Sequence, residues 1–478
     1  MRIPRWTNFS FCCYELVPTN KNNDEERSHL EMRKKQQDQM PLTMTQMEHP
    51  RAEEMKRISQ ILDENPIISH LVWQDLTGQI QSHGRGAHGL SAEQVLRAAI
   101  IKQTEGFSYE ELAFHILHSR CYRTFCRVGV THKGIGKSAL ASAIKNIAPG
   151  TWESIHRILA AYGQDKGIET GRDARIDCTV VSCNIHEPSD STLLWDAVRV
   201  ITRILTQVRD EVPFTFSDHT RKAKRQMLAI KNAKTMQIRK GLYEEMVKIT
   251  QKVVGYAGNL IHLLQNATSP YLVSLREELK RIVSLTHRVM DQTIRRVLHG
   301  EQVPAEEKVV SLFESHTDII KKDRRETLYG HKICLSVGRS NLITDCLVLD
   351  GNPADSTLVE SMLNRHDQIY GRYPLKAALD GGFASMNNLR FAKSKNVKDV
   401  CFAKKRGLST EQMCRSDYVY KKLRRFRAGI ESAISWLKRC FGLDRCTWKS
   451  LSSFHSYVWT SIVSANLLTL ARGADTIR

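Results

Sequence analysis

The 478-residue chain lacks any apolar run that approaches the roughly 18 residues that a membrane-spanning helix needs. The C-terminal segment SIVSANLLTLA is apolar, but it is too short. The first twenty residues lack both the continuous apolar stretch and the small-residue cleavage site of a secretory signal. We therefore expect a cytoplasmic protein that has no membrane partner.

Cysteine is too sparse for a disulfide scaffold, because only twelve occur in the whole chain. Three pairs lie near each other in sequence: Cys121 and Cys126, Cys178 and Cys183, and Cys440 and Cys446. Their spacing is too wide for a CxxC motif, and none has a second ligand pair at zinc-site spacing. The cysteines are therefore expected to be free thiols in a reducing compartment.

Acidic residues are too few to balance the basic ones. The chain has 71 Lys and Arg against 51 Asp and Glu, a net charge of +20. Such an excess is typical of proteins that bind nucleic acid. Residues 219–240 carry eight Lys or Arg and no acid. This run is either a solvated helix face or a surface that contacts DNA phosphates, and the absence of acids favours the second interpretation.

The N-terminal part divides by composition. Residues 20–55 are highly polar and charged, and we expect residues 1–54 to form a disordered or weakly ordered segment. The sequence pattern of residues 55–165 predicts short helices joined by tight turns. This arrangement indicates a helix-turn-helix-like DNA-binding domain. A plain helical bundle used for dimerisation would give the same pattern.

Two local signals support these helices. Capping boxes are expected at Ser91 with Gln94 and at Ser108 with Glu111. Gly106 stands between them, where a tight helix–helix turn favours glycine.

The segment THKGIGKS resembles a phosphate-binding loop. It lacks the first glycine of that motif, because Thr131 stands at the required position. No strand-like run leads into it either. We therefore expect Ser138 to cap a helix, and we do not expect nucleoside triphosphate binding.

The rest of the chain predicts an α/β domain with a long interruption. A strand is expected over residues 174–185, followed by helices over roughly 192–303. Further strands are expected at 331–338, 342–351, 374–380 and 397–405, with helices between and after them. The predicted catalytic domain thus comprises residues 172–190 and 325–472, and residues 191–324 form a helical insertion.

Three carboxylates are notable for their positions. Asp177 lies in the middle of a predicted strand, where a charge is costly unless it is paired or bound to metal. Asp380 ends a strand and precedes two glycines, which let other groups approach closely. Glu431 is the one acid among seven basic residues in segment 421–439.

The helix around Glu431 has two distinct faces. An apolar stripe is formed by Ile430, Ile434, Leu437 and Phe441. Arg427, Glu431 and Lys438 share the neighbouring flank. Glu431 therefore either pairs with Arg427 one turn away or holds a metal ion beside a cleft.

Convergence of the three carboxylates would favour hard cations. Oxygen ligands of this kind suit Mg²⁺ or Mn²⁺. Two such ions can activate a water or hydroxyl and stabilise the leaving oxygen of a phosphodiester. Arg427 and Lys438 would then bind phosphates beside the scissile bond.

At these residues the sequence resembles bacterial insertion-sequence transposases with a DDE triad on an RNase H-like fold. The resemblance spans roughly residues 85–470 and rests on IDCTVV, LDGGFAS and RAGIESAISWLKRCFGL. The family signature places Arg four residues before the Glu and Lys seven after it, as Arg427 and Lys438 do here. The signature's tyrosine would stand at position 424, where this chain has Arg424. Tyr420, one turn earlier, is the expected substitute.

The resemblance implies an RNase H-like mixed sheet with flanking helices and a catalytic triad of Asp177, Asp380 and Glu431 holding two Mg²⁺ or Mn²⁺ ions. It further implies DNA contacts from Arg427, Lys438, Arg424, Tyr420 and Arg439. The enzyme would bind terminal inverted repeats as a homodimer or higher oligomer, in the bacterial nucleoid. It would cleave the element ends and join them to target DNA.

Two other functions remain open on the sequence alone. One is an inactive DNA-binding regulator or relic, which the presence of all three acids disfavours. The other is a related nuclease without strand transfer.

Other residues compete for roles in such a site. Asp190 and Asp355 are expected as helix caps, whereas Asp196 and Glu326 could support the triad. His186 is either a metal ligand or a hydrogen-bonding loop residue. Three tryptophans are either packing residues or base-stacking ones: Trp195, Trp436 and Trp448.

Overall fold

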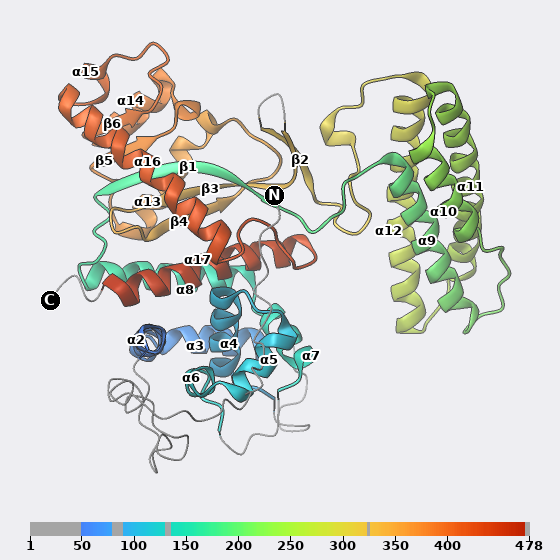
Figure 1. The fold of residues 1–478 in the computed structure, drawn as a ribbon, viewed down its shortest axis with the longest axis horizontal. Coiled ribbons are helices and arrows are strands. Elements are labelled where there is room, and N and C mark those ends of the chain that lie inside the picture. The colour runs from blue at the N-terminus through green and yellow to red at the C-terminus, as the bar shows by residue number, and fades with distance from the viewer. Residues whose placement is uncertain (1–48, 79–88, 130–134, 323–325, 474–478) are drawn as a thin grey trace, which may run out of the picture. The chain divides into compact units, whose positions relative to one another are not determined.

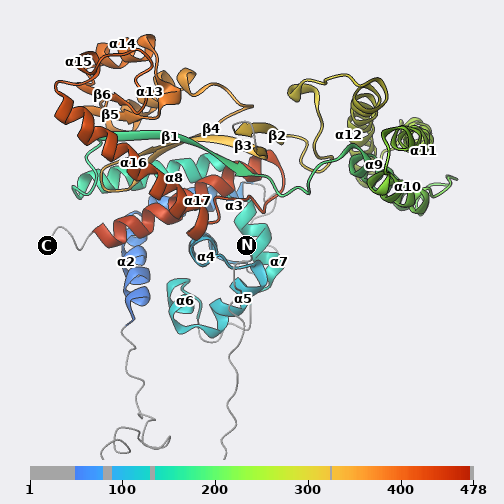
Figure 2. The same cartoon turned by 45° about the horizontal axis from the view of Figure 1, so that its top comes forward.

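The computed structural model describes residues 49–78, 89–129, 135–322 and 326–473 (Figure 1 and Figure 2). No helix in these ranges combines the length and apolar character that crossing a bilayer requires. The ten cysteines in these ranges are free thiols, as the sequence predicts. The expectation for residues 1–48 lies outside the described part of the chain.

The N-terminal region is helical, as predicted. Its helices are α2 (Pro50–Glu64), α3 (Ile67–Thr77), α4 (Ala92–Glu105), α5 (Tyr109–His118), α6 (Arg120–Phe125), α7 (Lys137–Lys145) and α8 (Pro149–Asp165). Helix α2 begins at Pro50, so the prediction of a weakly ordered segment is wrong for residues 50–54.

Helix termini in this region follow local sequence signals. Ser91 and Ser108 form the two expected capping boxes, and Gly106 ends α4 in the left-handed conformation, with φ of 71°. The expectation for Ser138 is wrong, because α7 begins one residue earlier with Gly136 at its N-cap.

Six strands form one mixed sheet, which confirms the predicted fold class. They are β1 (Asp173–Ser182), β2 (Asp318–Lys322), β3 (Glu326–Val337), β4 (Ile343–Val348), β5 (Lys376–Leu379) and β6 (Asp399–Phe402). The order is β2-β3-β1-β5-β6, and β4 also pairs with β3. β3 runs antiparallel to β1, β2 and β4, whereas β5 runs parallel to β1 and β6.

Strand β2 corrects the expected boundary of the insertion. The sequence predicts non-strand structure up to residue 324, but Asp318–Lys322 pairs with Glu326–Gly330 of β3. The polar segment DIIKK has no alternation long enough to indicate a strand. Pairing with β3 therefore determines its conformation, and the chain rejoins the sheet several residues earlier than expected.

The side chains of β1 point alternately to the two faces of the sheet. Ile176 lies in the core beneath helix α13 (Val359–Tyr370), together with the apolar residues of β5. Arg175 and Asp177 point to the opposite face, where both contact helix α16 (Asp417–Cys440). The strand thus buries one row of side chains and presents the other row to α16.

The insertion is helical, as predicted. It contains α9 (Asp190–Arg209), α10 (Thr220–Asn232), α11 (Met236–Leu263), α12 (Pro270–Thr293) and the π-helical turn η2 (Ile294–His299), followed by the 3₁₀ turn η3 (Ala305–Glu307). The four α-helices pack alongside one another around a hydrophobic core of their own (Figure 1). Their amphipathic faces are therefore satisfied within the insertion.

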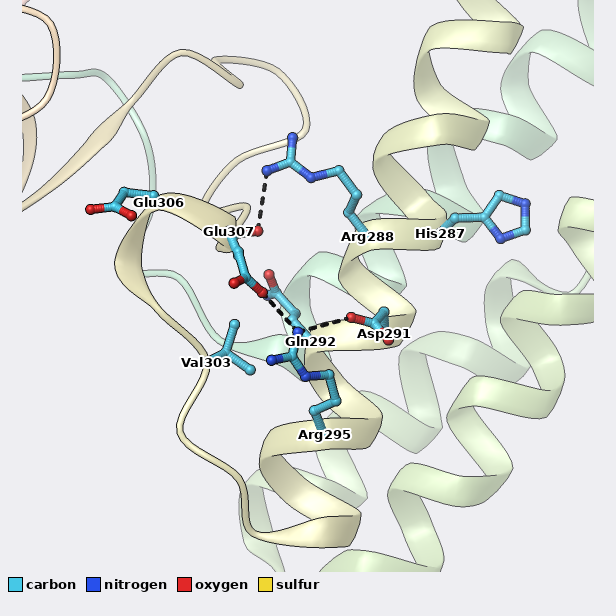
Figure 3. Close-up of a pocket in the computed structure, with 8 residues that line it drawn as sticks. All are labelled: His287, Arg288, Asp291, Gln292, Arg295, Val303, Glu306 and Glu307. Carbon is cyan, nitrogen blue, oxygen red and sulfur yellow. Dashed lines mark hydrogen bonds and ion pairs between the residues drawn. The ribbon is translucent and has the colours of Figure 1, made fainter.

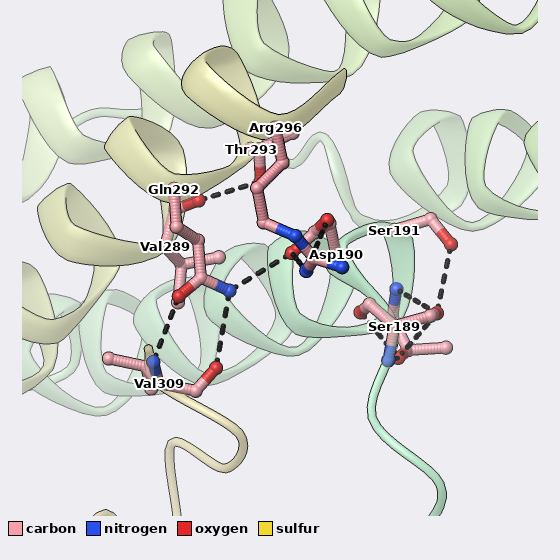
Figure 4. Close-up of polar contacts among 9 residues, drawn as sticks. Ser189, Asp190, Ser191, Val289, Gln292, Thr293, Arg296 and Val309 are labelled. Atoms are coloured by element: carbon pink, nitrogen blue, oxygen red, sulfur yellow. Dashed lines mark hydrogen bonds and ion pairs between the residues drawn. The ribbon is translucent and has the colours of Figure 1, made fainter. Parts of the chain in front are cut away.

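A buried polar network closes the base of this insertion (Figure 4). Gln292 donates to Asp190 at 2.9 Å, and it exchanges two hydrogen bonds with the backbone of Val309. Arg296 forms an ion pair with Asp190 at 3.1 Å. The sequence expectation that Asp190 caps α9 is wrong, because Ser189 is the N-cap and Asp190 instead joins the two ends of the insertion.

The remaining elements flank the sheet. They are η4 (Asp355–Thr357), α13, η5 (Gly381–Phe383), α14 (Met386–Ser394), α15 (Thr410–Met413), α16 and α17 (Leu451–Gly473). Helix α16 crosses β1, β5 and β6, whereas α17 lies beside α8 (Figure 1 and Figure 2).

One hydrophobic core joins the N-terminal helices to the sheet. It includes apolar residues of α2 to α8, β3, β4, α16 and α17. The His156 ring in α8 bonds to the carbonyl of Thr344 in β4, and Asn466 of α17 bonds to the backbone of Ile343. The boundary expected at residue 165 therefore does not separate two cores, because α8 packs with the sheet.

Candidate active site

Two of the predicted acids lie at neighbouring strands. Asp177 is in β1, and Asp380 directly follows β5. The two strands are parallel, with Ile176 opposite Leu379, so the residue after each of these lies at the same end of the pair. Strand register alone thus brings Asp177 and Asp380 together.

The third acid comes from helix α16 and meets the others at one guanidinium. Arg427 forms ion pairs with Asp177 at 2.9 Å, with Asp380 at 3.1 Å and with Glu431 at 2.8 Å. The structure therefore brings all three predicted carboxylates to one place. The simpler interpretation of Glu431, a pair with Arg427 one turn away, describes a contact within this same cluster.

Burial differs among the three acids. The side chain of Asp177 is 15% exposed, that of Asp380 is 37% and that of Glu431 is 65%. Burial raises the pKa of Asp177, an effect that the nearby Arg427 guanidinium opposes. The cluster therefore extends from a buried carboxylate at the sheet to an exposed one on the helix.

A close contact between β1 and α16 positions Glu431. The guanidinium of the buried Arg175 donates to the carbonyl of Phe426 at 3.2 Å, bonds to Asn341, and lies over the Phe426 ring. A Cβ on Gly429 would lie only 2.1 Å from Arg175 Nη1, so glycine allows this approach.

Sequence reasoning did not single out Arg175 or Gly429. The available signals were a glycine inside a strong helix pattern and an arginine two residues before Asp177 on the same strand face.

The two glycines after Asp380 have the role that the sequence indicated. A Cβ on Gly381 would lie 2.6 Å from the Lys404 side chain, and one on Gly382 would lie 2.5 Å from Asp355. Asp355 itself pairs with Lys332 of β3 at 2.6 Å. The prediction that Asp355 caps a helix is wrong, because α13 begins at Val359 after an N-cap with no side-chain bond.

The expected DNA-contacting residues fall into two groups. Arg424 and Arg439 are exposed on α16, and Lys438 donates to the carbonyl of Val180 at 3.0 Å. Tyr420 is buried, and its hydroxyl donates to the carbonyl of Phe402 at 3.0 Å. Its ring is therefore part of the core and is not available for stacking on a base.

The competing residues occupy other environments. His186 lies 3.6 Å from Asp196, and Asp196 is buried and paired with Arg199. Glu326 is exposed at the start of β3. All three tryptophans pack against hydrophobic cores: Trp195, Trp436 and Trp448. In the THKGIGKS segment, residues 131–134 lie outside the described residues, and Lys137 pairs with Glu110.

A pocket of about 420 Å³ lies elsewhere, between α12 and the segment that follows it (Figure 3). Its charged groups already neutralise one another, since Arg295 pairs with Asp291 and Glu307 and Arg288 donates to the carbonyl of Glu307. The carboxylate cluster is the stronger candidate for chemistry, because its three acids share a single cation.

The donor set at the cluster fits divalent cations of the Mg²⁺ type. All three groups supply carboxylate oxygens, which are the ligands that Mg²⁺ and Mn²⁺ prefer. Arg427 balances the charge of one carboxylate, so the other two leave a net negative charge. Movement of Arg427 away from the acids would give hard cations access to all three.

Residues 285–467 match the family model of the transposase DDE domain. The matched segment includes Asp380, Glu431, Arg427 and Lys438, but it begins after Asp177. No curated protein and no solved structure gives a match.

Proposed function

We propose that the chain is an insertion-sequence transposase that cleaves element ends and joins them to target DNA. The observation that carries the proposal is the convergence of Asp177, Asp380 and Glu431 on Arg427. The match to the transposase DDE domain supports the same function. The excess of basic residues over acidic ones supports DNA as the substrate.

In this proposal, Asp177, Asp380 and Glu431 hold two Mg²⁺ or Mn²⁺ ions. Bound there, the ions would supply Lewis-acid stabilisation of the attacking and leaving oxygens. Asp177 lies in β1 and Asp380 directly follows the paired strand β5, so we expect their separation to change little when DNA binds. Glu431 is carried by a helix that Arg175 and Gly429 fix to β1.

The proposed reaction has two steps with no covalent protein intermediate. Water attacks a phosphorus atom at the element end, and the bond to the 3′ oxygen breaks to release a 3′-hydroxyl. That hydroxyl then attacks a phosphorus atom of target DNA, and the displaced target 3′ oxygen leaves with a proton. The protein holds the phosphates in line with each attacking oxygen.

Basic side chains around the cluster are suited to hold those phosphates. Lys438 and Arg427 flank Glu431 on α16, and Arg424 and Arg439 are exposed on the same helix. When Arg427 leaves the carboxylates, its planar guanidinium can bind a phosphate in a bidentate manner. We do not include Tyr420 among the DNA contacts, because it is buried.

A second basic surface lies on helix α10. It is formed by the exposed Lys234 just after the helix and by five exposed residues of α10: Arg221, Lys222, Lys224, Arg225 and Lys231. The other two basic residues of that run, Arg239 and Lys240, donate to backbone carbonyls instead. We propose that the exposed six contact phosphates of the element ends, with two copies of the chain bringing the two ends together in the nucleoid.

The test uses purified protein and labelled DNA ends from the regions that flank the gene. We expect Asp177→Asn to abolish Mg²⁺-dependent cleavage while end binding changes less than about twofold, because the substitution keeps the shape and removes one ligand charge. Loss of binding in this variant would contradict a catalytic role. Cleavage without joining by the wild type would favour a nuclease, and binding without cleavage would favour an inactive regulator.

A further inference from the structure

Three side chains of types that can bind metals converge at the C-terminal end of β1, beyond Asp177. Cys183 directly follows β1, His331 lies in β3 opposite Val181, and His316 lies two residues before β2. The Cys183 sulfur and one nitrogen of each ring all lie within 4.8 Å of one another. Among the described residues this is the only group of three or more potential ligands with that geometry.

The outer nitrogen of each ring is held by a carboxylate. His331 Nδ1 lies 2.9 Å from Asp318 Oδ2, and His316 Nε2 lies 2.8 Å from Glu314 Oε2. Histidines that bind metals almost always donate their second ring N–H to such a partner, which fixes the tautomer and the ring orientation. Both rings therefore direct their remaining nitrogen toward the same point.

The carboxylates are themselves held by backbone donors. Asp318 accepts a hydrogen bond from the amide of Gly351 at 2.9 Å, and Glu314 accepts one from the amide of Ser450, also at 2.9 Å. Glu314 is 4% exposed, although an isolated buried carboxylate is costly. The outer shell is thus built from three chain segments before any metal is considered.

The inner nitrogens face each other. His316 Nδ1 and His331 Nε2 are 2.8 Å apart, and the two rings are inclined by only 14°. With both outer nitrogens protonated, the inner pair can be satisfied only by one shared proton. A cation can replace that proton, and Cys183, which is 4% exposed, supplies a thiolate beside it.

We propose that Cys183, His316 and His331 bind one Zn²⁺ ion. Thiolate and imidazole are the ligands that Zn²⁺ prefers, whereas Mg²⁺ prefers oxygen. Binding releases the thiol proton and the proton shared between the rings to solvent. This site shares no residue with the carboxylate cluster. Its thiolate and imidazole ligands favour Zn²⁺, whereas the carboxylates of the cluster favour Mg²⁺ or Mn²⁺.

The position of the site indicates a structural role. The insertion leaves the sheet after β1, and the chain returns through residues 314–318 to form β2. The three ligands belong to the departing segment, the returning segment and β3. The zinc ion therefore fixes the point where the insertion departs from and rejoins the catalytic sheet, and Glu314 extends this connection to Ser450 before α17.

The experiment measures metal bound by the full chain after exposure to Zn²⁺ and removal of the excess. We expect one zinc per chain by mass spectrometry, and Co²⁺ should give the charge-transfer absorption of a cobalt–thiolate bond. Cys183→Ser should lose the charge-transfer band, and His316→Gln should retain less than a tenth of the zinc. Asp318→Asn, which alters only the outer shell, should weaken zinc binding by roughly 10–100-fold.

Matched controls use residues of the same types elsewhere. Cys440→Ser removes an exposed thiol on α16, and His299→Gln removes an exposed histidine that ends η2. Both variants should bind zinc as the wild type does. Equal zinc binding by Cys183→Ser, His316→Gln and these controls would overturn the proposal.

One measurement does not depend on folded variants. X-ray absorption at the zinc edge of the wild-type protein should show one sulfur neighbour and two imidazole nitrogens. A spectrum with oxygen neighbours only, or wild-type protein that retains no zinc, would overturn the proposal. Neither result would bear on DNA cleavage, so this inference and the proposed function fail independently.

Discussion

At the scale of single residues, Arg427 is the shared ion-pair partner of the three acids in the candidate active site. Its guanidinium contacts three carboxylates, and its own side chain is only 17% exposed. Because it lies where the three carboxylates meet, it would compete with a divalent cation for the same oxygens. The proposed function therefore requires Arg427 to release the acids when metal binds.

This competition gives a prediction for Arg427→Gln. Without metal, the variant should be less stable by about 3 kcal/mol, because the largely buried carboxylate of Asp177 loses its partner. Protonation of Asp177, whose pKa is already raised by burial, limits the loss. Added Mn²⁺ should then stabilise the variant more than the wild type in urea unfolding.

The control is Arg425→Gln, which removes an exposed arginine on the same helix. Its response to Mn²⁺ should equal that of the wild type. An equal Mn²⁺ response in Arg427→Gln would show that the guanidinium and the metal do not share the carboxylates.

The sequence predicted the three acids because each stands in an unusual local setting. It could not predict that Arg427 contacts all three, since this depends on how α16 crosses β1 and β5. It also missed Arg175, whose buried charge is stabilised by a backbone carbonyl and an aromatic ring contributed from α16. Such partners become visible only in the folded chain.

At the scale of elements, the pairing of β1 with β3 connects the two candidate metal sites. Asp177 lies within this pairing opposite Leu335, Cys183 directly follows its last pair, and in that last pair Gly330 stands opposite Ser182. A Cβ on Gly330 would lie 2.0 Å from the carbonyl oxygen of Val181. The strands therefore approach more closely than any side chain at position 330 would allow.

Gly330→Ala should accordingly destabilise the protein by about 2–3 kcal/mol, because the clash is with backbone that cannot move aside cheaply. Urea unfolding measures the change. Gly255→Ala is the matched control, since Gly255 lies within helix α11 with nothing within 4 Å of the added Cβ. That substitution should stabilise the protein by about 1 kcal/mol.

If Gly330→Ala and Gly255→Ala changed the free energy of unfolding equally, the clash with the Val181 carbonyl would not explain the effect at position 330.

The sequence also located most elements, because helix caps and apolar periodicity are local. Capping at Ser91 and Ser108 was predicted from four-residue patterns alone. Strand β2 was missed, since its five residues become a strand only by pairing with β3. The cap expectations for Asp190 and Asp355 were wrong because α9 and α13 begin at other positions, and these carboxylates pair with the distant residues Arg296 and Lys332.

At the scale of the whole molecule, buried histidines join separate parts of the chain. His156 of α8 is fully buried, and its ring contacts Thr344 in β4 and Asn466 in α17. The neutral ring satisfies both, with one nitrogen donating to the carbonyl and the other accepting from the amide. Burial lowers the pKa of His156 below its usual value of 6.5.

This burial predicts acid sensitivity. Above the unfolded-state pKa of 6.5, neither state binds the proton, and the contribution of His156 is complete. As pH falls below that value, the unfolded chain takes up the proton first, so stability decreases by about 1 kcal/mol per pH unit for one such histidine. His366, buried against the carbonyl of Gly171, has its pKa lowered in the same direction.

Urea unfolding at about pH 7.5 and about pH 5.5 measures this loss. His156→Gln should be less stable than the wild type at the higher pH and should lose less stability on acidification. If the wild type and His156→Gln lost the same free energy of unfolding between these two pH values, His156 would not take up a proton on unfolding.

The most direct test of the central claim exchanges one carboxylate ligand for a thiolate. Asp380 is suitable, because it is partly exposed after β5 and its replacement leaves the strand intact. With labelled DNA from the flanks of the gene, Asp380→Cys should be inactive in Mg²⁺ and should regain at least about tenfold activity in Mn²⁺, which accepts sulfur more readily. The wild type should cleave in both metals. Full Mg²⁺-dependent cleavage by Asp380→Cys would contradict a metal centre formed by Asp177, Asp380 and Glu431.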